Sequence, residues 1–387
     1  MQVVVTGIGL LSALGSSLET SWLRLIAGES AIKLRQPFSE LPPRPLGLIG
    51  ETPAQLIPLI EQVVPAALKD AGLAPPLPDC GVEIGSSRSQ QARWEQYLVN
   101  YLRYQAIDPN YCPEAHLEDW LGSLPHAGAI AAAKLVGATD TVLAPMASCA
   151  TGIWSVARAF QLIQSGQCCR VLAGAVEAPV TRLTLAGFAQ MGALAKTGCY
   201  PFDRHREGLV LGEGGAVFVL ETAELAKNRG AKIYGQILGV GLTNDACAVN
   251  SSDPEGNIAQ KAIAQCLNRS HLVAADIDYI HSHGTSTLLN DQFEANLIQK
   301  LFSPKVAVSS TKGSTGHTLG ASGALGIAFS LMALKDGFLP PCVGLTEPEF
   351  DLNFVINAQA NDLRNVLCLS FGFGGQNAAI ALGKLPD

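Results

Sequence analysis

The feature that most constrains the fold is a double series of short apolar segments that alternate with segments of helical periodicity. Apolar runs of this kind are typical of strands that are buried on both faces of a sheet. Their alternation with helices predicts an α/β protein with buried, largely parallel strands. The expected strands of the first series lie at 3–8, 82–84, 141–144, 171–174 and 216–220, and those of the second at 233–240, 277–281, 306–309, 366–369 and 378–382.

The two series look like one design used twice. Helical periodicity also occurs in both, at 18–25, 59–68 and 153–163 and then at 258–267 and 321–334. A chain of 387 residues exceeds what one hydrophobic core usually organises. We therefore predict an N-terminal half, 1–228, and a C-terminal half, 229–387, which meet in the polar segment 227–230.

Composition limits the possible partners. The formal net charge is −7 and no run of Lys or Arg is present, which argues against binding to nucleic acid or to a membrane surface. The longest uncharged stretch, 313–334, holds a histidine and many Gly, Ser and Thr residues, so we expect a loop and a buried helix there. The start, Met1–Val5, lacks the charged region of a secretory signal, and a cytoplasmic location is expected.

The ten cysteines do not form a recognisable metal or disulfide pattern. No C-x-x-C pair is present, so we expect buried thiols and no bound metal. Gly7 and Gly9 resemble part of a dinucleotide fingerprint, but the third glycine is missing from the required position. We interpret them as a tight strand exit and expect no cofactor.

The sharpest local feature is Cys149, which stands between the expected strand 141–144 and the expected helix 153–163. At such an elbow, the free N–H groups and positive partial charge of the helix start should lower the thiol pKa. Small neighbours in Ala147–Gly152 would let a substrate carbonyl approach the sulfur. The alternative is a buried structural cysteine, the commoner role of a lone cysteine.

Polar or glycine-rich segments follow three expected strands of the C-terminal half. His283 follows 277–281, Lys312 and His317 follow 306–309, and Ser370–Asn377 leaves 366–369. Sites in α/β proteins commonly form at the carboxyl ends of strands. A glycine-rich loop can also bring backbone N–H groups close to a reacting oxygen. The sequence therefore predicts that these three segments form one shared site, and it argues against three unrelated surface loops.

The combined motifs resemble those of the elongating β-ketoacyl-(acyl carrier protein) synthases, the condensing enzymes of fatty-acid and polyketide synthesis. The similarity spans nearly the whole chain, at 4–9, Cys149, 201–204, 208–214, 283–287, 312–317 and 371–375. It implies the thiolase-like fold, a duplicated five-layered αβαβα architecture. It also implies an acyltransferase that performs a decarboxylative Claisen condensation of an acyl thioester with malonyl-(acyl carrier protein).

The resemblance assigns roles to individual residues. Cys149 would carry the acyl group, and His283 and His317 would assist decarboxylation and stabilise the enolate. Lys312 would set the electrostatics around His317, with Glu294 as its partner. The backbone N–H groups of Cys149 and Phe373 would form the oxyanion hole.

Further residues match substrate-binding positions of the same family. Thr285 and Thr287 resemble threonines that contact the pantetheine arm. Phe188, Phe371 and Phe373 match aromatic positions at the acyl pocket, and Gly374 belongs to the same loop. Without the resemblance, the three phenylalanines would be interpreted as core.

The resemblance also implies an acyl carrier protein, acyl- or malonyl-loaded, as partner and a homodimer as the assembly. We expect the dimer contact to include the strand 171–174 and parts of 86–127, which departs from the family's glycine-rich pattern. The helix start near Thr52 lacks the basic residues usual for carrier docking. Candidates for a compensating basic patch are Arg35, Arg44, Lys196, Arg204 and Arg206.

Two other functions share this fold. A thiolase uses a second cysteine as acid and base, but the loop Gly372–Gln376 contains none, and Cys368 lies within the preceding strand. A catalytically silent partner subunit of the chain-length-factor kind typically lacks the active cysteine, which is present here. The sequence therefore favours an active condensing enzyme over both.

Overall fold

The computed structural model describes residues 1–108, 120–246, 253 and 255–385. The strands of the N-terminal half are β1 (Val3–Ser12), β2 (Lys33–Arg35), β3 (Arg44–Leu46), β4 (Cys80–Gly85), β5 (Val142–Leu143), β6 (Arg170–Glu177) and β7 (Gly214–Thr222). Its helices are α1 (Leu18–Ile26), α2 (Leu56–Asp70), α3 (Gln91–Ile107), α5 (Ala127–Val136), α6 (Thr151–Gln164), α7 (Arg182–Gln190) and α8 (Ala223–Asn228).

The remaining strands and helices belong to the C-terminal half. Its strands are β8 (Gly235–Asn244), β9 (Tyr279–His281), β10 (Ala307–Ser309), β11 (Phe338–Leu339), β12 (Asn353–Phe354), β13 (Gln359–Ala360), β14 (Asn365–Gly372) and β15 (Gln376–Gly383). Its helices are α9 (Asn257–Ser270), α10 (Leu288–Leu301), α11 (Lys312–Thr315) and α12 (Ser322–Asp336), with short 3-10 turns at Ala274–Asp276 and Leu319–Ala321.

The same strand topology occurs in both halves. The N-terminal strands lie in the order β5-β4-β6-β7-β1, and the C-terminal strands lie in the order β10-β9-β14-β15-β8. In each set the first three strands are parallel and the last two pairings are antiparallel. Val3–Val5 of β1 pairs with Gly235–Ile237 of β8 and joins the sets into one sheet within the described residues. The exact boundary at residue 228 stays a prediction.

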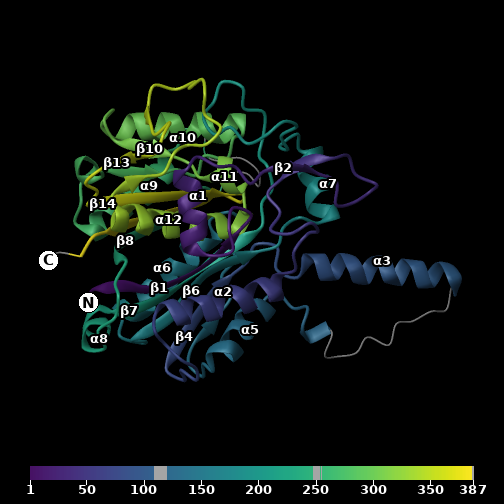
Figure 1. Cartoon of the computed structure of the whole chain (residues 1–387), viewed down its shortest axis with the longest axis horizontal. Coiled ribbons are helices and arrows are strands. Elements are labelled where there is room, and N and C mark those ends of the chain that lie inside the picture. The colour runs from purple at the N-terminus through teal and green to yellow at the C-terminus, as the bar shows by residue number, and fades with distance from the viewer. Residues whose placement is uncertain (109–119, 247–252, 254, 386–387) are drawn as a thin grey trace.

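The expectation of largely parallel strands is wrong. Among the described strands of the main sheet, five pairings are parallel and five are antiparallel. Continuous apolar sequence reports burial on both faces of a strand, and it carries no information on strand direction. Here both faces are covered, because helices lie outside and between the two halves of the sheet (Figure 1).

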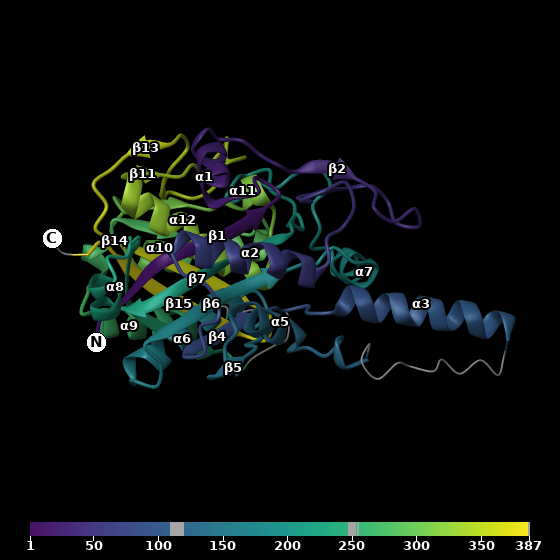
Figure 2. The same cartoon turned by 60° about the horizontal axis from the view of Figure 1, so that its bottom comes forward.

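Helices α6 and α12 form the central layer between the N-terminal and C-terminal strands (Figures 1 and 2). A Cβ atom on Gly152 of α6 would lie 2.4 Å from the backbone nitrogen of Ala324 in α12, so the two helices can touch only because this residue is glycine. Residues 322–334 of α12 are buried on every side, as expected for the uncharged stretch. None of the described helices is long and apolar enough to cross a membrane.

Helices α2 and α5 pack on the outer face of the N-terminal strands, and α9 and α10 pack on that of the C-terminal strands. Each outer layer has its own apolar cluster, separate from the central one. The chain is thus built in five layers, helix, sheet, helix, sheet, helix. This matches the expected thiolase-like architecture.

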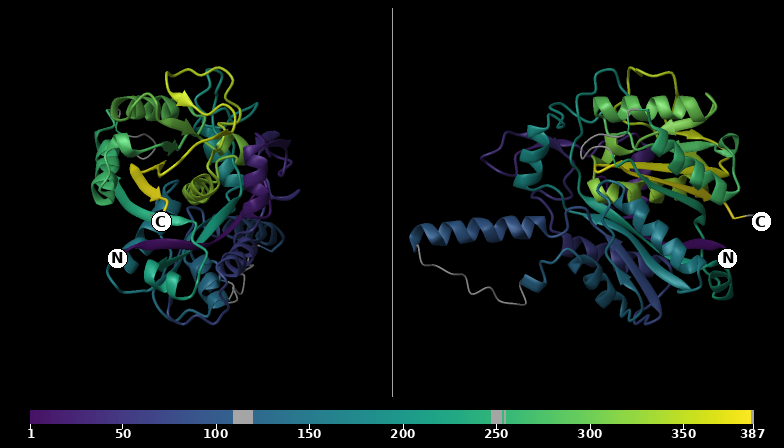
Figure 3. Two further views of the ribbon diagram at one scale, coloured as in Figure 1. Left: turned by 60° about the vertical axis from the view of Figure 1, so that its left-hand side comes forward. Right: turned by 180° about the vertical axis from the view of Figure 1, so that it is seen from behind.

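Helix α3 is the exception to this compact arrangement. It extends away from the body in Figures 1 and 2 and in the right-hand view of Figure 3, and none of its residues is buried. The strand expected at a dimer contact, 171–174, lies in β6, which is paired on both sides by β4 and β7. That part of the expectation is wrong, since the free edge of these strands belongs to β5. Residues 109–119 of the other expected contact lie outside the described residues.

Glu83 in β4 has a buried carboxyl group whose ionisation the fold makes unfavourable. Its side chain is not exposed, and neither carboxylate oxygen has a hydrogen-bond partner among the described residues. Burial raises the pKa of Glu83 to about 7, against the opposing charge of Arg158. Because the folded-state pKa lies above the unfolded value, its contribution to stability is present at low pH and is lost as the pH rises through about 7.

We expect Glu83→Met to increase the free energy of unfolding by about 2 kcal/mol more at pH 8 than at pH 5, because the variant has no carboxylate to ionise. Urea unfolding at both pH values measures the difference. Glu61→Gln on the exposed face of α2 is the matched control and should show no such pH dependence. Equal effects of Glu83→Met at the two pH values would contradict the assignment.

Candidate active site

Cys149 lies on a tight elbow directly before α6. The preceding residue, Ser148, has a φ of 49°, a left-handed conformation that is unfavourable for a residue with a side chain. Thr151 fixes this turn, because its hydroxyl accepts from Ala147 N at 2.9 Å and donates to Ser148 O at 2.7 Å. The elbow therefore presents the Cys149 side chain in one orientation.

His283 and His317 lie beside Cys149. His283 follows β9 and His317 follows α11. The Cys149 sulfur and the nearest imidazole nitrogens of both histidines all lie within 4.8 Å of one another. The two rings are 5.2 Å apart between centroids and nearly perpendicular, and both are buried. The structure thus brings together three residues that are far apart in the sequence.

The backbone of each histidine is held by neighbouring groups. His317 N donates to Val210 O at 2.6 Å, and His317 O accepts from Gly212 N at 3.0 Å. The Glu294 carboxylate accepts from His283 N at 2.6 Å and from Gly284 N at 2.7 Å. These contacts place both rings before any substrate arrives.

Lys312 contacts the backbone of His283, and its charge also acts on His317, as the expected electrostatic role requires. Its buried ammonium group donates to the carbonyl oxygen of His283. Burial lowers the pKa of Lys312, while the charge of Glu294 raises it. Lys312 and Glu294 therefore hold the same peptide segment from two sides, so Glu294 belongs to the network as expected.

Both histidines are neutral near pH 7. Burial is the largest cause that lowers the pKa of His283 and of His317 well below the ordinary value, and the positive charge of Lys312 adds to it. A neutral imidazole carries one N–H donor and one acceptor nitrogen. The pair can therefore both accept a proton and donate hydrogen bonds.

The expected lowering of the Cys149 pKa is wrong. Burial raises the pKa of this thiol to about 11, although the charges of Lys312 and Arg88 oppose the shift. The helix start was expected to dominate, but loss of water around the sulfur is the larger effect. In the resting site Cys149 is a thiol, and it needs a proton acceptor when it reacts.

The glycine-rich loop approaches Cys149 closely. A Cβ atom on Gly372 would lie 3.0 Å from Cys149 N, so this residue must be glycine for the loop to approach. The next residue, Phe373, packs against Phe188 at 6.1 Å between ring centroids, in an apolar cluster that includes Cys149. Gly374 has a φ of 79° and turns the chain away.

The other expected substrate residues lie on the histidine side. Phe371 meets the His283 ring edge to face at 6.1 Å, and it is buried. Thr285 and Thr287 share a hydrogen bond of 2.9 Å between their hydroxyl oxygens, and Thr287 also accepts from Asn290 N at the start of α10. Both threonines follow His283 within a few residues, so they border the same site.

One residue at the site was missed in the sequence. The hydroxyl of Ser370 donates to Cys149 O at 2.9 Å and lies 3.5 Å from His283 Nδ1. It links the backbone of the cysteine to the ring of the histidine. Its position at the exit of β14, before the glycine-rich loop, was the available signal.

Two family models cover most of the chain. Residues 51–226 match the N-terminal domain of the β-ketoacyl synthase family, and residues 234–346 match its C-terminal domain. The chain belongs to the β-ketoacyl synthase family. The resemblance expected from the sequence is thereby confirmed.

Individual β-ketoacyl synthases are similar to this chain over nearly its full length. The chain is 33% identical to 3-oxoacyl-(acyl-carrier-protein) synthase 2 of Rhizobium meliloti (strain 1021), with 99% of both chains covered. Its fold is similar to a chain of the solved complex of a type II polyketide synthase acyl-carrier protein with its ketosynthase bound to the hexaketide, with a TM-score of 0.93, 25% identity and 99% of both chains covered. It is also similar to the ishigamide ketosynthase/chain length factor, with a TM-score of 0.91, 27% identity and 100% and 99% covered.

The three side chains at the centre of this β-ketoacyl synthase site also form a possible metal-ligand set. Of the described residues, Cys149, His283 and His317 place a sulfur and two imidazole nitrogens close enough to hold one ion. An ion there would occupy the groups that the family's chemistry uses. The absence of a resident metal stays a prediction.

The raised thiol pKa makes a testable prediction about Cys149. Below a pKa of about 11 the thiolate fraction rises about tenfold per pH unit, so alkylation by iodoacetamide should rise about a hundredfold from pH 7 to pH 9 without a plateau. Intact mass measures the rate, and Cys149→Ala gives the background from the exposed Cys169. A plateau near pH 7 would show that the helix start lowers the pKa after all.

Proposed function

We propose that this chain is a β-ketoacyl-(acyl carrier protein) synthase that extends an acyl thioester by decarboxylative Claisen condensation in fatty-acid or polyketide synthesis. The observation that carries the proposal is the meeting of one thiol with two neutral imidazoles within 4.8 Å. A thiol can carry the acyl group, and paired N–H donors suit the developing oxygen charge of an enolate. Full-length relatives that are named 3-oxoacyl-(acyl-carrier-protein) synthase 2 support it.

The first step transfers the acyl group to Cys149. The sulfur attacks the thioester carbonyl of an acyl carrier protein, and its proton passes to an imidazole nitrogen of the adjacent pair. The C–S bond to the carrier then breaks, and the leaving thiolate takes that proton. The neutral state of His283 and His317 supports this step, because a charged imidazolium could accept nothing.

The second step produces the nucleophile. The C–C bond of the malonyl group breaks, carbon dioxide leaves, and the electron pair remains as the enolate of an acetyl thioester. N–H groups of His283 and His317 would donate to the enolate oxygen, since both rings are held beside Cys149. Lys312 adds a positive charge in this low-dielectric site and keeps the rings neutral.

The third step forms the new bond. The enolate carbon attacks the acyl carbonyl on Cys149, and the tetrahedral oxyanion would accept from the N–H groups of Cys149 and Phe373. The approach of Gly372 to Cys149 N supports this placement. Collapse of the intermediate breaks the C–S bond, releases the β-ketoacyl thioester, and leaves the Cys149 thiolate to take up a proton.

Both rival functions lack support at the site. A thiolase would need a second reactive cysteine, but Cys368 is buried in β14 with its sulfur 3.7 Å from His281 Nδ1. A silent partner subunit would have no use for a complete set of Cys149, His283, His317 and Lys312. If the wild-type chain is active and Cys149→Ala is not, the chain is a condensing enzyme and not a silent subunit.

Docking of an acidic carrier protein needs a basic surface. The basic residues proposed for it differ in how exposed they are and in whether an acidic residue already pairs with them. Arg206 is buried and pairs with Glu349, so it is removed from the expected patch. Arg35 pairs with Glu51 at 2.9 Å on the surface. Lys196 and Arg204 are exposed. We propose that these two residues contribute the remaining basic contacts to the acidic carrier.

Separating the half-reactions tests the proposed roles. We expect Cys149→Ala to abolish acyl loading, because a methyl group cannot attack a thioester. His283→Ala and His317→Ala should each lower malonyl decarboxylation and condensation about a hundredfold, yet retain measurable loading, since one imidazole remains beside the sulfur. Intact-mass analysis of enzyme and carrier protein reports all three activities.

The controls use exposed residues of the same types, Cys169→Ala and His205→Ala. Neither should change loading or decarboxylation. Acyl mass that persists in Cys149→Ala would refute the nucleophile, and full decarboxylation in both histidine variants would remove the enolate site. The cytoplasmic location expected from the sequence stays a prediction.

We also propose that the chain forms a twofold homodimer through β5 and α3. The outer edge of β5 has no neighbouring strand within the described residues, and Leu143 and Met146 beside it are exposed. Helix α3 adds a large exposed apolar surface, formed by Trp94, Tyr97, Leu98, Val99, Leu102, Tyr104 and Ile107. A second copy would pair edge to edge and cover both.

Sedimentation equilibrium at micromolar concentration tests this assembly, and we expect a dimer. Leu98→Lys combined with Leu102→Lys places charges on one face of α3 and should dissociate it. Leu289→Lys on the exposed face of α10 is the control and should remain dimeric. A persistent monomer would refute the homodimer, and a stable complex formed only with a second, different subunit would favour the ketosynthase and chain-length-factor arrangement.

A further inference from the structure

We propose that Arg88 determines acyl specificity by donating hydrogen bonds to an oxygen atom on the acyl group carried by Cys149. The favoured substrates are then acyl thioesters that bear a keto oxygen or a carboxylate, in preference to plain alkyl chains. This inference rests on the proposed function, because it concerns the acyl group that Cys149 would carry.

The Arg88 side chain has no polar partner in the described parts of the chain. Its Nε atom is buried and makes no hydrogen bond, and no ion pair of the guanidinium is found there. Its nearest aromatic neighbour is Phe188, with 5.8 Å from the guanidinium carbon to the ring centroid. An unsatisfied buried donor is costly, so such a group usually has a ligand or a functional role.

Arg88 is also close enough to Cys149 to act on it. Its positive charge lowers the pKa of the Cys149 thiol, although burial dominates. Phe188 packs in the same apolar cluster as Cys149, together with Phe373. The guanidinium therefore lies beside the apolar cluster that contains the reactive sulfur.

The turn that carries Arg88 is rigidly held. The buried carboxylate of Glu177 accepts from Ser87 N at 2.7 Å, from Arg88 N at 3.0 Å and from the hydroxyl of Ser86 at 2.7 Å. Ser89 has a φ of 48°, which completes the turn. The backbone position from which the Arg88 side chain starts is therefore fixed.

The direction of the acyl group follows from what surrounds Cys149. The histidines, Lys312 and the paired threonines all come from the C-terminal half and border the position proposed for the malonyl unit. Arg88 and Phe188 come from the N-terminal half. An acyl group on the sulfur is excluded from the histidine side during condensation, so it extends toward Phe188 and Arg88.

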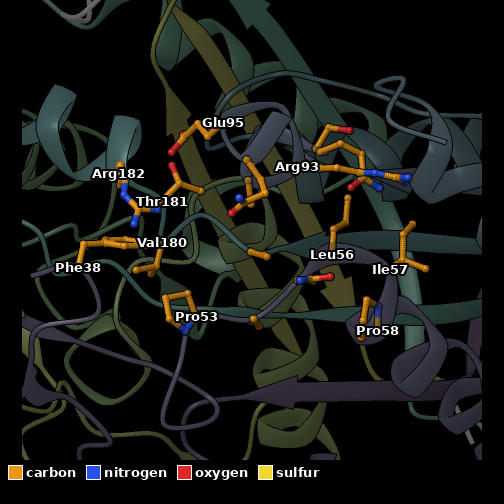
Figure 4. A pocket seen from close by; sticks show the side chains of 17 residues that line it. Phe38, Pro53, Leu56, Ile57, Pro58, Arg93, Glu95, Val180, Thr181 and Arg182 are labelled. Carbon is orange, nitrogen blue, oxygen red and sulfur yellow. The ribbon is translucent and has the colours of Figure 1, made fainter. Parts of the chain in front are cut away.

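A second unpaired donor lies on the same turn. Gln90 is 7% exposed, and its Nε2 atom has no partner among the described residues. It lines a cavity of about 520 Å³ at the base of α3 (Figure 4). Val180 belongs both to this cavity and to the apolar cluster around Cys149, so the cavity adjoins the acyl side of the site.

These donors distinguish acyl groups by their oxygen content. A saturated alkyl chain that covers Arg88 would remove water from the guanidinium and offer nothing in exchange. A keto oxygen or a carboxylate accepts a charge-assisted hydrogen bond from the same group. We therefore expect discrimination of about tenfold or more in favour of an oxygen-bearing chain.

The test compares acyl groups of equal length on one carrier protein. Hexanoyl, 3-oxohexanoyl and adipoyl thioesters are loaded onto Cys149, and intact mass gives the rate for each. We expect the wild-type chain to load at least one oxygenated group about tenfold faster than hexanoyl. The 3-oxo group and the terminal carboxylate distinguish an oxygen near the thioester from one at the chain end.

Arg88→Met should remove that preference, so that all three acyl groups load at similar rates relative to one another, whereas Arg88→Lys keeps the charge and should keep part of the preference. Arg103→Met is the matched control, because Arg103 is exposed further along α3 and does not line the cavity. Malonyl decarboxylation should be the same in all these variants, since it uses the histidine side.

Several results would overturn the inference. One is a wild-type chain that loads hexanoyl as fast as both oxygenated groups. Another is an equal slowing of all three acyl groups and of iodoacetamide alkylation in Arg88→Met, which would mean that Arg88 acts only on the thiol. If no acyl group loads on the wild-type chain while malonyl decarboxylation is also absent, the proposed function itself fails, and that outcome is distinct from a missing preference.

Discussion

The close crossing of α6 and α12 is the contact on which the site depends. Gly152 lets the backbone of α6 touch Ala324 of α12, at the centre of the molecule and near the first turn of both helices. Cys149 lies three residues before Gly152, just ahead of α6. His317 lies seven residues before Ala324, ahead of α12. A side chain at position 152 would separate the helices and, with them, the thiol from the imidazole. Packing of the central layer thus sets the distance between reacting groups.

Burial, more than local charge, sets the protonation states at this site. The same loss of water that raises the pKa of the Cys149 thiol lowers the pKa of His283 and of His317. All three groups are consequently neutral near pH 7. Neutral groups avoid the cost of a buried ion pair, and they leave the proton transfer to be driven by the arriving thioester. Lys312 is the charged exception, and it is held by the His283 carbonyl oxygen beside the Glu294 carboxylate.

The sequence predicted those features that local pattern determines. Strand positions, the buried character of α12 and the meeting of Cys149 with His283 and His317 all followed from apolar runs and from residues at strand ends. Strand direction did not, because β6 and β7 are equally apolar whether they run parallel or antiparallel. The thiol pKa was mispredicted for a related reason: the start of α6 is visible in the sequence, but the extent to which the fold removes water from Cys149 is not. Ser370 begins the glycine-rich segment that the sequence singled out, but its role was missed because only the fold places its hydroxyl between Cys149 and His283.

Glu177 connects the two sides of the site physically. Its carboxylate accepts from the turn that carries Arg88, and it also accepts from Gly320 N, at 3.2 Å, three residues after His317. The wall that meets the acyl group and the segment that bears a catalytic imidazole are therefore fixed by one buried side chain. A Cβ atom on Gly320 would lie 2.5 Å from that carboxylate, so this approach requires glycine. Because both segments are bound to the same carboxylate, the acyl side and the segment that bears His317 share one structural support.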